Sequence, residues 1–292
     1  MSESKAVLII GGSGFVGTHL ALRLREDYRV ITTYRHNSVP IPGVLSLPMM
    51  AKDDAWLNQM CQRFAPEVLI YLGGPEDPLL ADRDLGTAER LHSSMAGDFL
   101  KVTEPYFSHF IYASNTSVFD GKKGNYRESE SVAPSTNFGR LKVAAENWIK
   151  SHSNSYTIMR FSPLIGRGTP YRPSWFDRLR IAHSRNEKIE LGASDYFSFT
   201  SVTAAVDAVT AVMEAGVKKN IYHYGGLTRV TPYEVGLKLC EQLKWNPDFI
   251  TPKYRPQNLK LDYSLNSSEL IRNLNTTAYE IDDALESFRN SV

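Results

Sequence analysis

A glycine-rich segment close to the N-terminus is the first part of the sequence that could bind a ligand. Gly12, Gly14 and Gly17 fit the spacing G-x-G-x-x-G, and Gly11, Gly14 and Gly17 fit the related spacing G-x-x-G-x-x-G. An apolar run precedes the segment and an amphipathic stretch follows it, so a strand, a turn and a helix are expected in that order. Such a turn lets the backbone approach a pyrophosphate at the helix N-terminus.

We therefore predict a dinucleotide site at this turn, and the alternative is a turn without a ligand. The residues expected to contact the cofactor are Gly11, Gly14, Phe15, Val16 and Gly17.

The residues after the second expected strand bear on which dinucleotide binds. An NAD site usually places an acidic residue there to hold the ribose hydroxyls, but no Asp or Glu occurs between Asp27 and Asp53. Arg35, together with His36, could pair with a 2′-phosphate instead. This favours NADP and leaves NAD open, and the alternative is that Arg35 is a solvated loop charge.

Other chemistries lack support in the sequence. The histidines show no metal-ligand spacing, so no metal site is assigned, and the two cysteines, Cys61 and Cys240, form no Cys-x-x-Cys pair. Neither a G-x-S-x-G elbow nor a phosphate-loop G-K-S/T is present, which leaves hydrolase and kinase functions unsupported.

The elements that must position the glycine turn alternate between two periodicities in the first half of the chain. Short apolar, β-branched runs predict strands at residues 7–10, 30–34, 68–72, 110–113 and 156–161. Helical periodicity predicts helices at 15–26, 54–64, 85–102 and 136–150. Alternating strands and helices are typical of a doubly wound parallel sheet, the Rossmann α/β arrangement.

The regular alternation of strand and helix patterns ends after residue 161, where prolines and glycines indicate an irregular segment. Helices are expected at 174–185, 203–214 and 232–243, the last with Thr231 as N-cap and Pro232 at the first helical position. We predict a dinucleotide-binding domain over residues 1–162, to which residues 192–216 return, and a smaller α/β substrate lobe mainly over residues 163–292.

Composition and charge limit the kinds of binding partner that can be expected. The 33 Lys and Arg residues nearly balance the 32 Asp and Glu residues, giving a net charge of +1, so neither nucleic acid nor an anionic membrane surface is an expected partner. No apolar run approaches the ~18 residues of a membrane span, and the N-terminus lacks signal-peptide features. A soluble, cytoplasmic protein is expected.

Three segments resemble the extended short-chain dehydrogenase/reductases, and within them the dTDP-4-dehydrorhamnose reductase branch, which also contains the regulatory β subunit of methionine adenosyltransferase. They are residues 112–121 (YASNTSVFDG), 138–146 (FGRLKVAAE) and 254–262 (YRPQNLKLD). The resemblance runs from the glycine turn to about residue 274. It implies a Rossmann domain that binds NAD(P), a nucleotide sugar held between this domain and the C-terminal lobe, and a homodimer or a regulatory protein partner.

The resemblance also implies roles for several residues. Gly73 and Gly74 would pass beside the cofactor, and Pro163 lies in a segment that would run beside the nicotinamide into the substrate lobe. The family's Tyr-x-x-x-Lys spacing has Phe138 and Lys142 here, and Asn115 stands at the family's Ser/Thr position. Lys142 would still hold the nicotinamide ribose, whereas phenylalanine carries no proton to transfer.

Two hypotheses follow from this degenerate catalytic set. Either the chain is an NADP(H)-dependent reductase, epimerase or dehydratase of nucleotide sugars with a different proton source, or it is a catalytically silent NAD(P)-binding protein that regulates or binds a partner. Substitute proton donors are Ser114, Thr116, Tyr126 and Tyr171, and the arginines that could meet a diphosphate are Arg167, Arg172 and Arg178.

Overall fold

A seven-stranded parallel sheet is the centre of the computed structural model, which describes residues 5–49, 54–74, 78–89 and 95–290. The strand order is β11-β6-β5-β4-β1-β2-β3. The strands are β1 (Ala6–Ile10), β2 (Arg29–Tyr34), β3 (Leu45–Pro48), β4 (Val68–Tyr71), β5 (His109–Asn115), β6 (Tyr156–Phe161) and β11 (Asn220–Tyr224). The predicted doubly wound α/β sheet is thus confirmed.

Helices cover both faces of this sheet, which explains why its central strands are apolar along their whole length. On one face α1 (Phe15–Leu24) and α8 (Val202–Ala215) contribute buried side chains to the core. On the other face α2 (Asp54–Phe64), α5 (Met95–Thr103) and α6 (Asn137–His152) do so.

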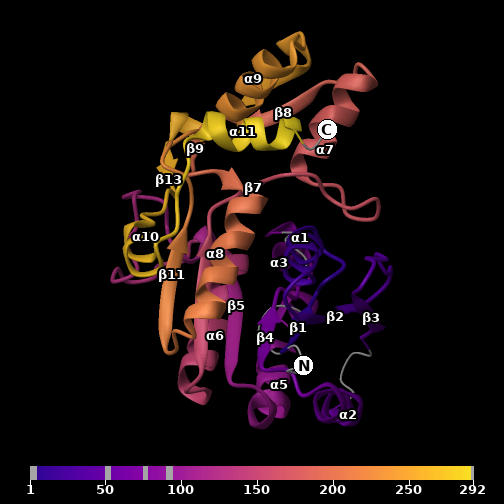
Figure 1. Cartoon of the computed structure of the whole chain (residues 1–292). Coiled ribbons are helices and arrows are strands. Elements are labelled where there is room, and N and C mark those ends of the chain that lie inside the picture. Colours follow the sequence, from indigo (N-terminus) through magenta and orange to yellow (C-terminus); the bar gives the residue numbers. More distant parts are fainter. Residues whose placement is uncertain (1–4, 50–53, 75–77, 90–94, 291–292) are drawn as a thin grey trace.

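A second core lies beyond the carboxyl ends of the strands, in the upper part of Figure 1. It is built by α7 (Trp175–Ser184), β8 (Ile189–Gly192), α9 (Pro232–Leu243), β12 (Ile250–Lys253) and α11 (Ile281–Asn290). Three short parallel pairs complete this region: β7 (Leu164–Ile165) with β10 (Thr200–Ser201), β9 (Asp195–Tyr196) with β13 (Leu261–Asp262), and β8 with β12. Helix α10 (Ser268–Leu274) packs beside β11.

The predicted strands are all present, with ends shifted by a few residues, but two strands of the sheet were missed. Strand β3 is short and half-buried, and β11 lies after residue 161, where the regular alternation of strand and helix patterns ends. In the predicted helix 85–102 the structure has α4 (Leu85–Glu89) and α5, while residues 90–94 lie outside the described part of the chain. The short α3 (Pro78–Arg83) was also missed.

The predicted start of α9 is confirmed. Thr231 accepts a hydrogen bond from the Glu234 backbone N–H, and the Glu234 carboxylate accepts one from the Thr231 backbone N–H. This capping box satisfies two backbone donors that the helix itself leaves without partners. None of the described helices combines the length and the apolar character needed to cross a membrane.

A buried ion pair joins α6 to β6. Arg160 donates from Nε to Glu146 Oε1 at 2.9 Å and from Nη2 to Oε2 at 2.6 Å, and the two side chains are only 2% and 0% exposed. The two-pronged geometry satisfies both carboxylate oxygens, which a buried charge requires.

The same guanidinium continues into β11. Arg160 Nη1 lies 3.2 Å from His223 Nε2, and His223 Nδ1 lies 2.8 Å from the Tyr126 carbonyl oxygen. Because a guanidinium only donates, the ring proton belongs on Nδ1, which then donates to Tyr126. Burial and the neighbouring Arg160 charge lower the pKa of His223 to about 3, which keeps the ring neutral. The network therefore ties α6, β6, β11 and the segment around Tyr126 together.

Breaking this pair on one side should destabilise the protein strongly. Glu146→Gln leaves the Arg160 charge buried without its carboxylate, so the free energy of unfolding should fall by about 3–5 kcal/mol. Urea denaturation measures this loss. The exposed pair of Glu190 and Lys253 serves as control, because Glu190→Gln should cost less than about 1 kcal/mol.

A double variant separates charge burial from packing. Glu146→Leu combined with Arg160→Met removes both charges, so its loss should be clearly smaller than that of Glu146→Gln. Equal losses in the two variants would contradict the role given to the buried charge.

Candidate functional site

The glycine turn lies where the strand order reverses. Strand β1 pairs with β2 on one side and with β4 on the other, and all three run in the same direction. In open parallel sheets this reversal leaves a crevice at the carboxyl ends of the strands, where ligands bind. The turn between β1 and α1 is at that edge.

Close packing explains the spacing of the glycines. A Cβ atom on Gly17 would lie 2.4 Å from the Gly11 carbonyl oxygen and 2.6 Å from the Gly12 Cα, so any side chain at Gly17 would push α1 away from the turn. Gly11 has φ +84°, a conformation that favours glycine. The turn is held by a 3.0 Å bond from the Gly14 N–H to the Gly11 carbonyl oxygen.

The N-terminus of α1 is suited to a phosphate. Gly14 is the N-cap, and no side chain caps the first backbone N–H groups of the helix. These donors and the positive end of the helix dipole favour an anion, and a glycine cap leaves room for it. Phe15 and Val16, at the start of this helix, are both partly exposed. The turn therefore fits the pyrophosphate of a dinucleotide.

The segment after β4 lies against the turn. The Leu72 N–H donates to the Ile10 carbonyl oxygen at 2.9 Å, and a Cβ on Gly11 would lie 3.1 Å from the Leu72 carbonyl oxygen. Gly73 and Gly74 follow directly, and both are partly exposed. The structure thus brings these glycines, predicted from the family resemblance, to the edge that carries the glycine turn.

Two other predicted cofactor residues approach the same edge. Arg35 follows β2, the neighbour of β1, and its side chain is exposed. Pro163 follows β6, and its carbonyl oxygen accepts a 3.3 Å bond from the Thr200 N–H. Further along this crossover, a Cβ on Gly166 would lie 3.1 Å from the Phe15 ring. The crossover therefore packs on the start of α1.

Lys142 and Phe138 lie one turn apart on α6, which Thr136 caps by accepting a bond from the Gly139 N–H. Lys142 is 2% exposed, with its Nζ 3.5 Å from the Ala113 carbonyl oxygen and 5.6 Å from the centre of the Phe138 ring. The ring of Tyr112 lies at a similar distance from Nζ, 5.7 Å. The ammonium is thus held between two aromatic rings at the end of β5.

Phe138 is buried in a small apolar cluster. Its ring is 3% exposed and packs with Ala81 of α3, Ala88 of α4 and Leu141 of α6. The ring has no group that can donate or accept a proton. Phe138, which the resemblance predicts at the family's tyrosine position, is thus an apolar side chain that helps to hold α3 and α4 on α6.

Asn115 ends β5 and caps the short 3₁₀ turn Thr116–Val118. Its Oδ1 accepts bonds from the Ser117 N–H at 3.0 Å and from the Ser117 hydroxyl at 2.6 Å. These bonds orient the amide, so its NH₂ group is the part that could donate to a ligand.

The proposed substitute proton donors lie in different surroundings. Tyr126 donates from its hydroxyl to Asp120 Oδ1 at 2.8 Å and stacks on Phe119. Tyr171 is 55% exposed, and Ser114 and Thr116 are buried. His92, which the resemblance matches to a family asparagine in the helix predicted at 85–102, lies outside the described residues.

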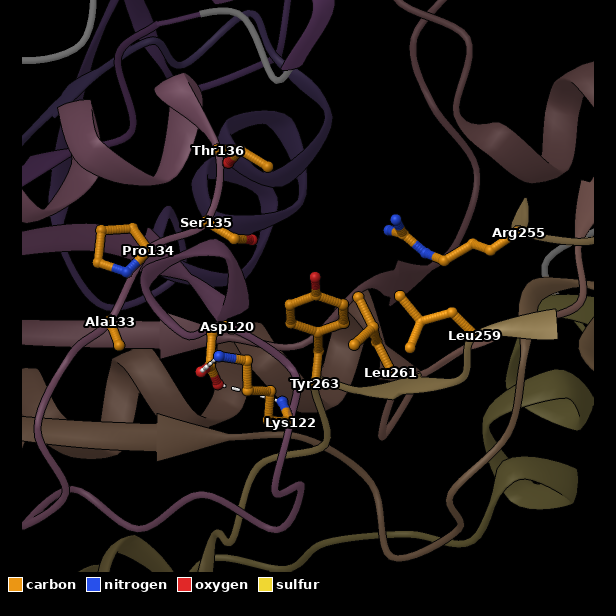
Figure 2. A pocket seen from close by; sticks show the side chains of 10 residues that line it. All are labelled: Asp120, Lys122, Ala133, Pro134, Ser135, Thr136, Arg255, Leu259, Leu261 and Tyr263. Carbon is orange, nitrogen blue, oxygen red and sulfur yellow. Dashed lines mark hydrogen bonds and ion pairs between the residues drawn. The ribbon is translucent and has the colours of Figure 1, made fainter. Parts of the chain in front are cut away.

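A cavity of about 630 Å³ opens beside the N-terminal end of α6. Figure 2 shows the Tyr263 hydroxyl and the Arg255 guanidinium directed into it, facing Ser135 and Thr136 across the space. The remaining lining residues are Asp120, Lys122, Ala133, Pro134, Leu259 and Leu261. Segments 120–136 and 255–263, far apart in sequence, therefore form one pocket that combines polar groups with an apolar surface.

This pocket was not predicted, although its residues 255–261 lie in a segment that carries the family resemblance. Burial raises the pKa of Tyr263, so the hydroxyl stays protonated and can donate a hydrogen bond at neutral pH. The suggested diphosphate ligands Arg167, Arg172 and Arg178 are not among the described residues that line it. No group of three or more described His, Cys, Asp or Glu side chains could hold a metal ion.

Comparison with known proteins places these features in context. The family described as RmlD substrate binding domain matches residues 5–289. The methionine adenosyltransferase 2 subunit beta of Pongo abelii is 21% identical over 282 residues, covering 89% of this chain and 81% of the relative.

Two solved structures share the fold. The dTDP-4-dehydrorhamnose reductase of Bacillus anthracis str. Ames, in complex with NADP, has a TM-score of 0.82 at 18% identity and covers 99% of this chain and 100% of its own. The dTDP-glucose 4,6-dehydratase of Streptomyces venezuelae, with NAD bound, has a TM-score of 0.83 at 14% identity and covers 98% and 97%. At these identities the likeness establishes the Rossmann-type fold.

The tight packing at Gly17 can be tested by one methyl group. Gly17→Ala should lower the free energy of unfolding by about 1–3 kcal/mol, because the added Cβ overlaps the backbone of the turn. Thermal or urea unfolding measures the change. Gly86→Ala in α4 is the matched control, since the nearest atom to its Cβ is 3.8 Å away. Equal stability of the two variants would show that the turn is not closely packed against α1.

Proposed function

The chain belongs to the RmlD substrate binding domain family, and from this premise we propose that it binds a nicotinamide dinucleotide across the carboxyl edge of the sheet. The observation that carries the proposal is the glycine turn, whose backbone leaves room for a pyrophosphate beside the uncapped N-terminus of α1. Structural relatives that contain NADP or NAD support it. The cofactor-binding residues are Gly11, Gly14, Phe15, Val16, Gly17, Arg35, Gly73, Gly74, Lys142 and Pro163.

NADP(H) is the preferred cofactor in this proposal, and NAD(H) the weaker one. Arg35 is exposed at the end of β2 beside the glycine turn, and its guanidinium suits a 2′-phosphate. Residues 1–162, with 192–216, would hold the dinucleotide, and residues 163–292 would mainly hold the substrate.

The substrate class proposed is a nucleotide sugar. The sugar would lie near Lys142 and Asn115, and the nucleoside diphosphate would occupy the cavity between segments 120–136 and 255–263. The apolar wall of Leu259 and Leu261 suits a base, and the Arg255 guanidinium suits a phosphate. The name dTDP-glucose 4,6-dehydratase of one structural relative supports this class.

The residues of this chain are better suited to bind the cofactor and the sugar than to catalyse proton transfer to the sugar. When bound, the nicotinamide supplies or accepts a hydride. Lys142 would hold the nicotinamide ribose, and the Asn115 amide would donate a hydrogen bond to a sugar carbonyl oxygen. Phe138 supplies no proton to that oxygen, and loss of a positioned general acid costs ~10²–10⁴ in rate. Ordinary family-type turnover is therefore expected to be slow.

A second candidate function is a catalytically silent NAD(P)-binding regulatory protein. Replacement of the tyrosine by buried Phe138 and of the Ser/Thr by Asn115 favours it, since the binding residues remain while the proton donor is absent. Relatives named methionine adenosyltransferase 2 subunit beta add support for a partner protein. This candidate predicts ligand-dependent binding to a partner and no turnover.

Cofactor choice can be tested by fluorescence titration with NADPH and NADH. NADPH should bind more tightly, and Arg35→Ala should weaken NADPH about tenfold, the loss of roughly 1.4 kcal/mol, while leaving NADH nearly unchanged. Arg272→Ala, on exposed α10 surface, is the control for a lost positive charge. No binding of either dinucleotide would contradict both functions and leave an interaction scaffold with an empty glycine turn.

The substitution Phe138→Tyr tests the proposal that this chain lacks the family's general acid. Reduction of dTDP-4-dehydrorhamnose with NADPH should appear or rise about 100-fold, because the phenol would regain a proton beside the Lys142 ammonium. The gain should vanish in Phe138→Tyr combined with Lys142→Met.

Two other outcomes of the Phe138→Tyr experiment would be informative. Unchanged rates in a folded, NADPH-binding variant would argue against Phe138 at the reacting centre. Loss of a native activity would assign the phenylalanine to a different mechanism.

A further inference from the structure

The cavity wall that carries Arg255 is a loop tied at both ends to one neighbouring segment. We define the 254–260 arm as the residues between β12 and β13. At its start the Ala193 N–H donates to the Lys253 carbonyl oxygen at 2.9 Å, and at its end the Leu261 N–H donates to the Ser194 carbonyl oxygen at 3.0 Å. The Arg255 N–H also donates to Ser194 Oγ at 3.0 Å. The arm is thus anchored on residues 193–194.

The Arg255 side chain is held from one side only. Its Nε and Nη2 donate to Asp195 Oδ1 and Oδ2 at 2.5 and 2.8 Å. A guanidinium has five N–H donors, so this pair uses two and leaves three, of which one on Nη1 and one on Nη2 form the outer edge. Arg255 lines the cavity, and Figure 2 shows its guanidinium extending into it.

The backbone of the arm is in a conformation that non-glycine residues adopt rarely. Gln257 and Asn258 have φ of +55° and +53°, two consecutive left-handed residues. Asparagine tolerates this region, whereas the left-handed conformation is unfavourable for glutamine and most other residues. Such a turn persists only where the surroundings impose it, and it recurs at ligand sites. Here it turns the chain directly after Arg255, whose carbonyl oxygen accepts a 3.2 Å bond from the Asn258 N–H.

We propose that Asp195 and the left-handed turn at Gln257 and Asn258 are positioning elements that hold Arg255 ready for the diphosphate of the substrate. The inference rests on the nucleotide-sugar pocket proposed above. The outer edge of a guanidinium held by a carboxylate matches two phosphate oxygens, and its fixed orientation removes the entropy cost of ordering a long side chain on binding.

The other charged residues of the pocket lie on the opposite wall. There Asp120 pairs with Lys122 at 3.5 Å and accepts the Tyr126 hydroxyl. On the wall formed by residues 255–263, Arg255 is the lining cation, and its pair with Asp195 leaves N–H donors toward the cavity.

The electrostatic effect of Asp195 and its positioning role predict opposite changes in diphosphate affinity when Asp195 is substituted. Asp195→Asn removes a negative charge near the phosphates, so electrostatics alone would tighten diphosphate binding. If Asp195 positions Arg255, the same substitution weakens it. The contrast between dTDP and thymidine isolates this effect, because damage to the whole pocket would weaken both ligands.

The experiment measures dissociation constants of dTDP and thymidine for the full chain, saturated with NADPH, by ligand-observed NMR. The variants are Asp195→Asn and Asn258→Gly. Glu190→Gln is the charge control, since it removes one carboxylate on the neighbouring β8. Asn275→Gly is the backbone control, because Asn275 is an exposed asparagine with φ +49° outside the pocket.

Wild type should prefer dTDP by at least about tenfold. Asp195→Asn should reduce that preference about five- to tenfold and Asn258→Gly about threefold, both through weaker dTDP binding with thymidine unchanged. Each control should stay within about twofold of wild type.

The contrary results are distinguishable. No dTDP preference in wild type would overturn the pocket assignment and this inference with it, while the NADPH titration still reports on the cofactor site. A preference that Asp195→Asn keeps or increases would overturn the positioning role alone. Equal weakening of dTDP and thymidine would assign Asp195 a merely structural role.

Discussion

The buried pair of Arg160 and Glu146 is the interaction on which the arrangement of the site depends. It fixes α6, which carries Phe138 and Lys142, to strand β6, the neighbour of the edge strand β11. Through neutral His223 the same guanidinium reaches the edge strand β11 and the Tyr126 backbone, close to the segment that forms one wall of the cavity. Because neither charge tolerates burial alone, the four segments are held in one relative position.

Binding and chemistry depend on different physical features in the function proposed here. A pyrophosphate is held by backbone N–H groups and space, both of which the glycine turn and α1 provide. Proton transfer needs a titratable side chain at one point, and the family resemblance implies that the apolar Phe138 ring stands at that point. Its burial among Ala81 and Ala88 gives Phe138 a packing role.

The cavity shows how the C-terminal region completes the site. Its walls come from a segment between β5 and α6 and from the 254–260 arm, which is anchored on residues 193–194. Each wall alone is a surface loop with ordinary polar residues. Only their juxtaposition places the Tyr263 hydroxyl and the Arg255 guanidinium opposite Ser135 and Thr136, as Figure 2 shows.

Local patterns in the sequence determined the five inner strands, most of the helices around them, the capping of α9 and the glycine turn, because each follows from periodicity or backbone sterics over a few residues. The prediction that Phe138 stands at the family's tyrosine position also came from the sequence, by its spacing from Lys142. Strands β3 and β11, the Arg160–Glu146–His223 network and the cavity were decided by the tertiary structure alone. The bonded partners of the network lie 14 to 97 residues apart along the chain, and no local pattern specifies which distant polar groups meet once burial forces them to find partners.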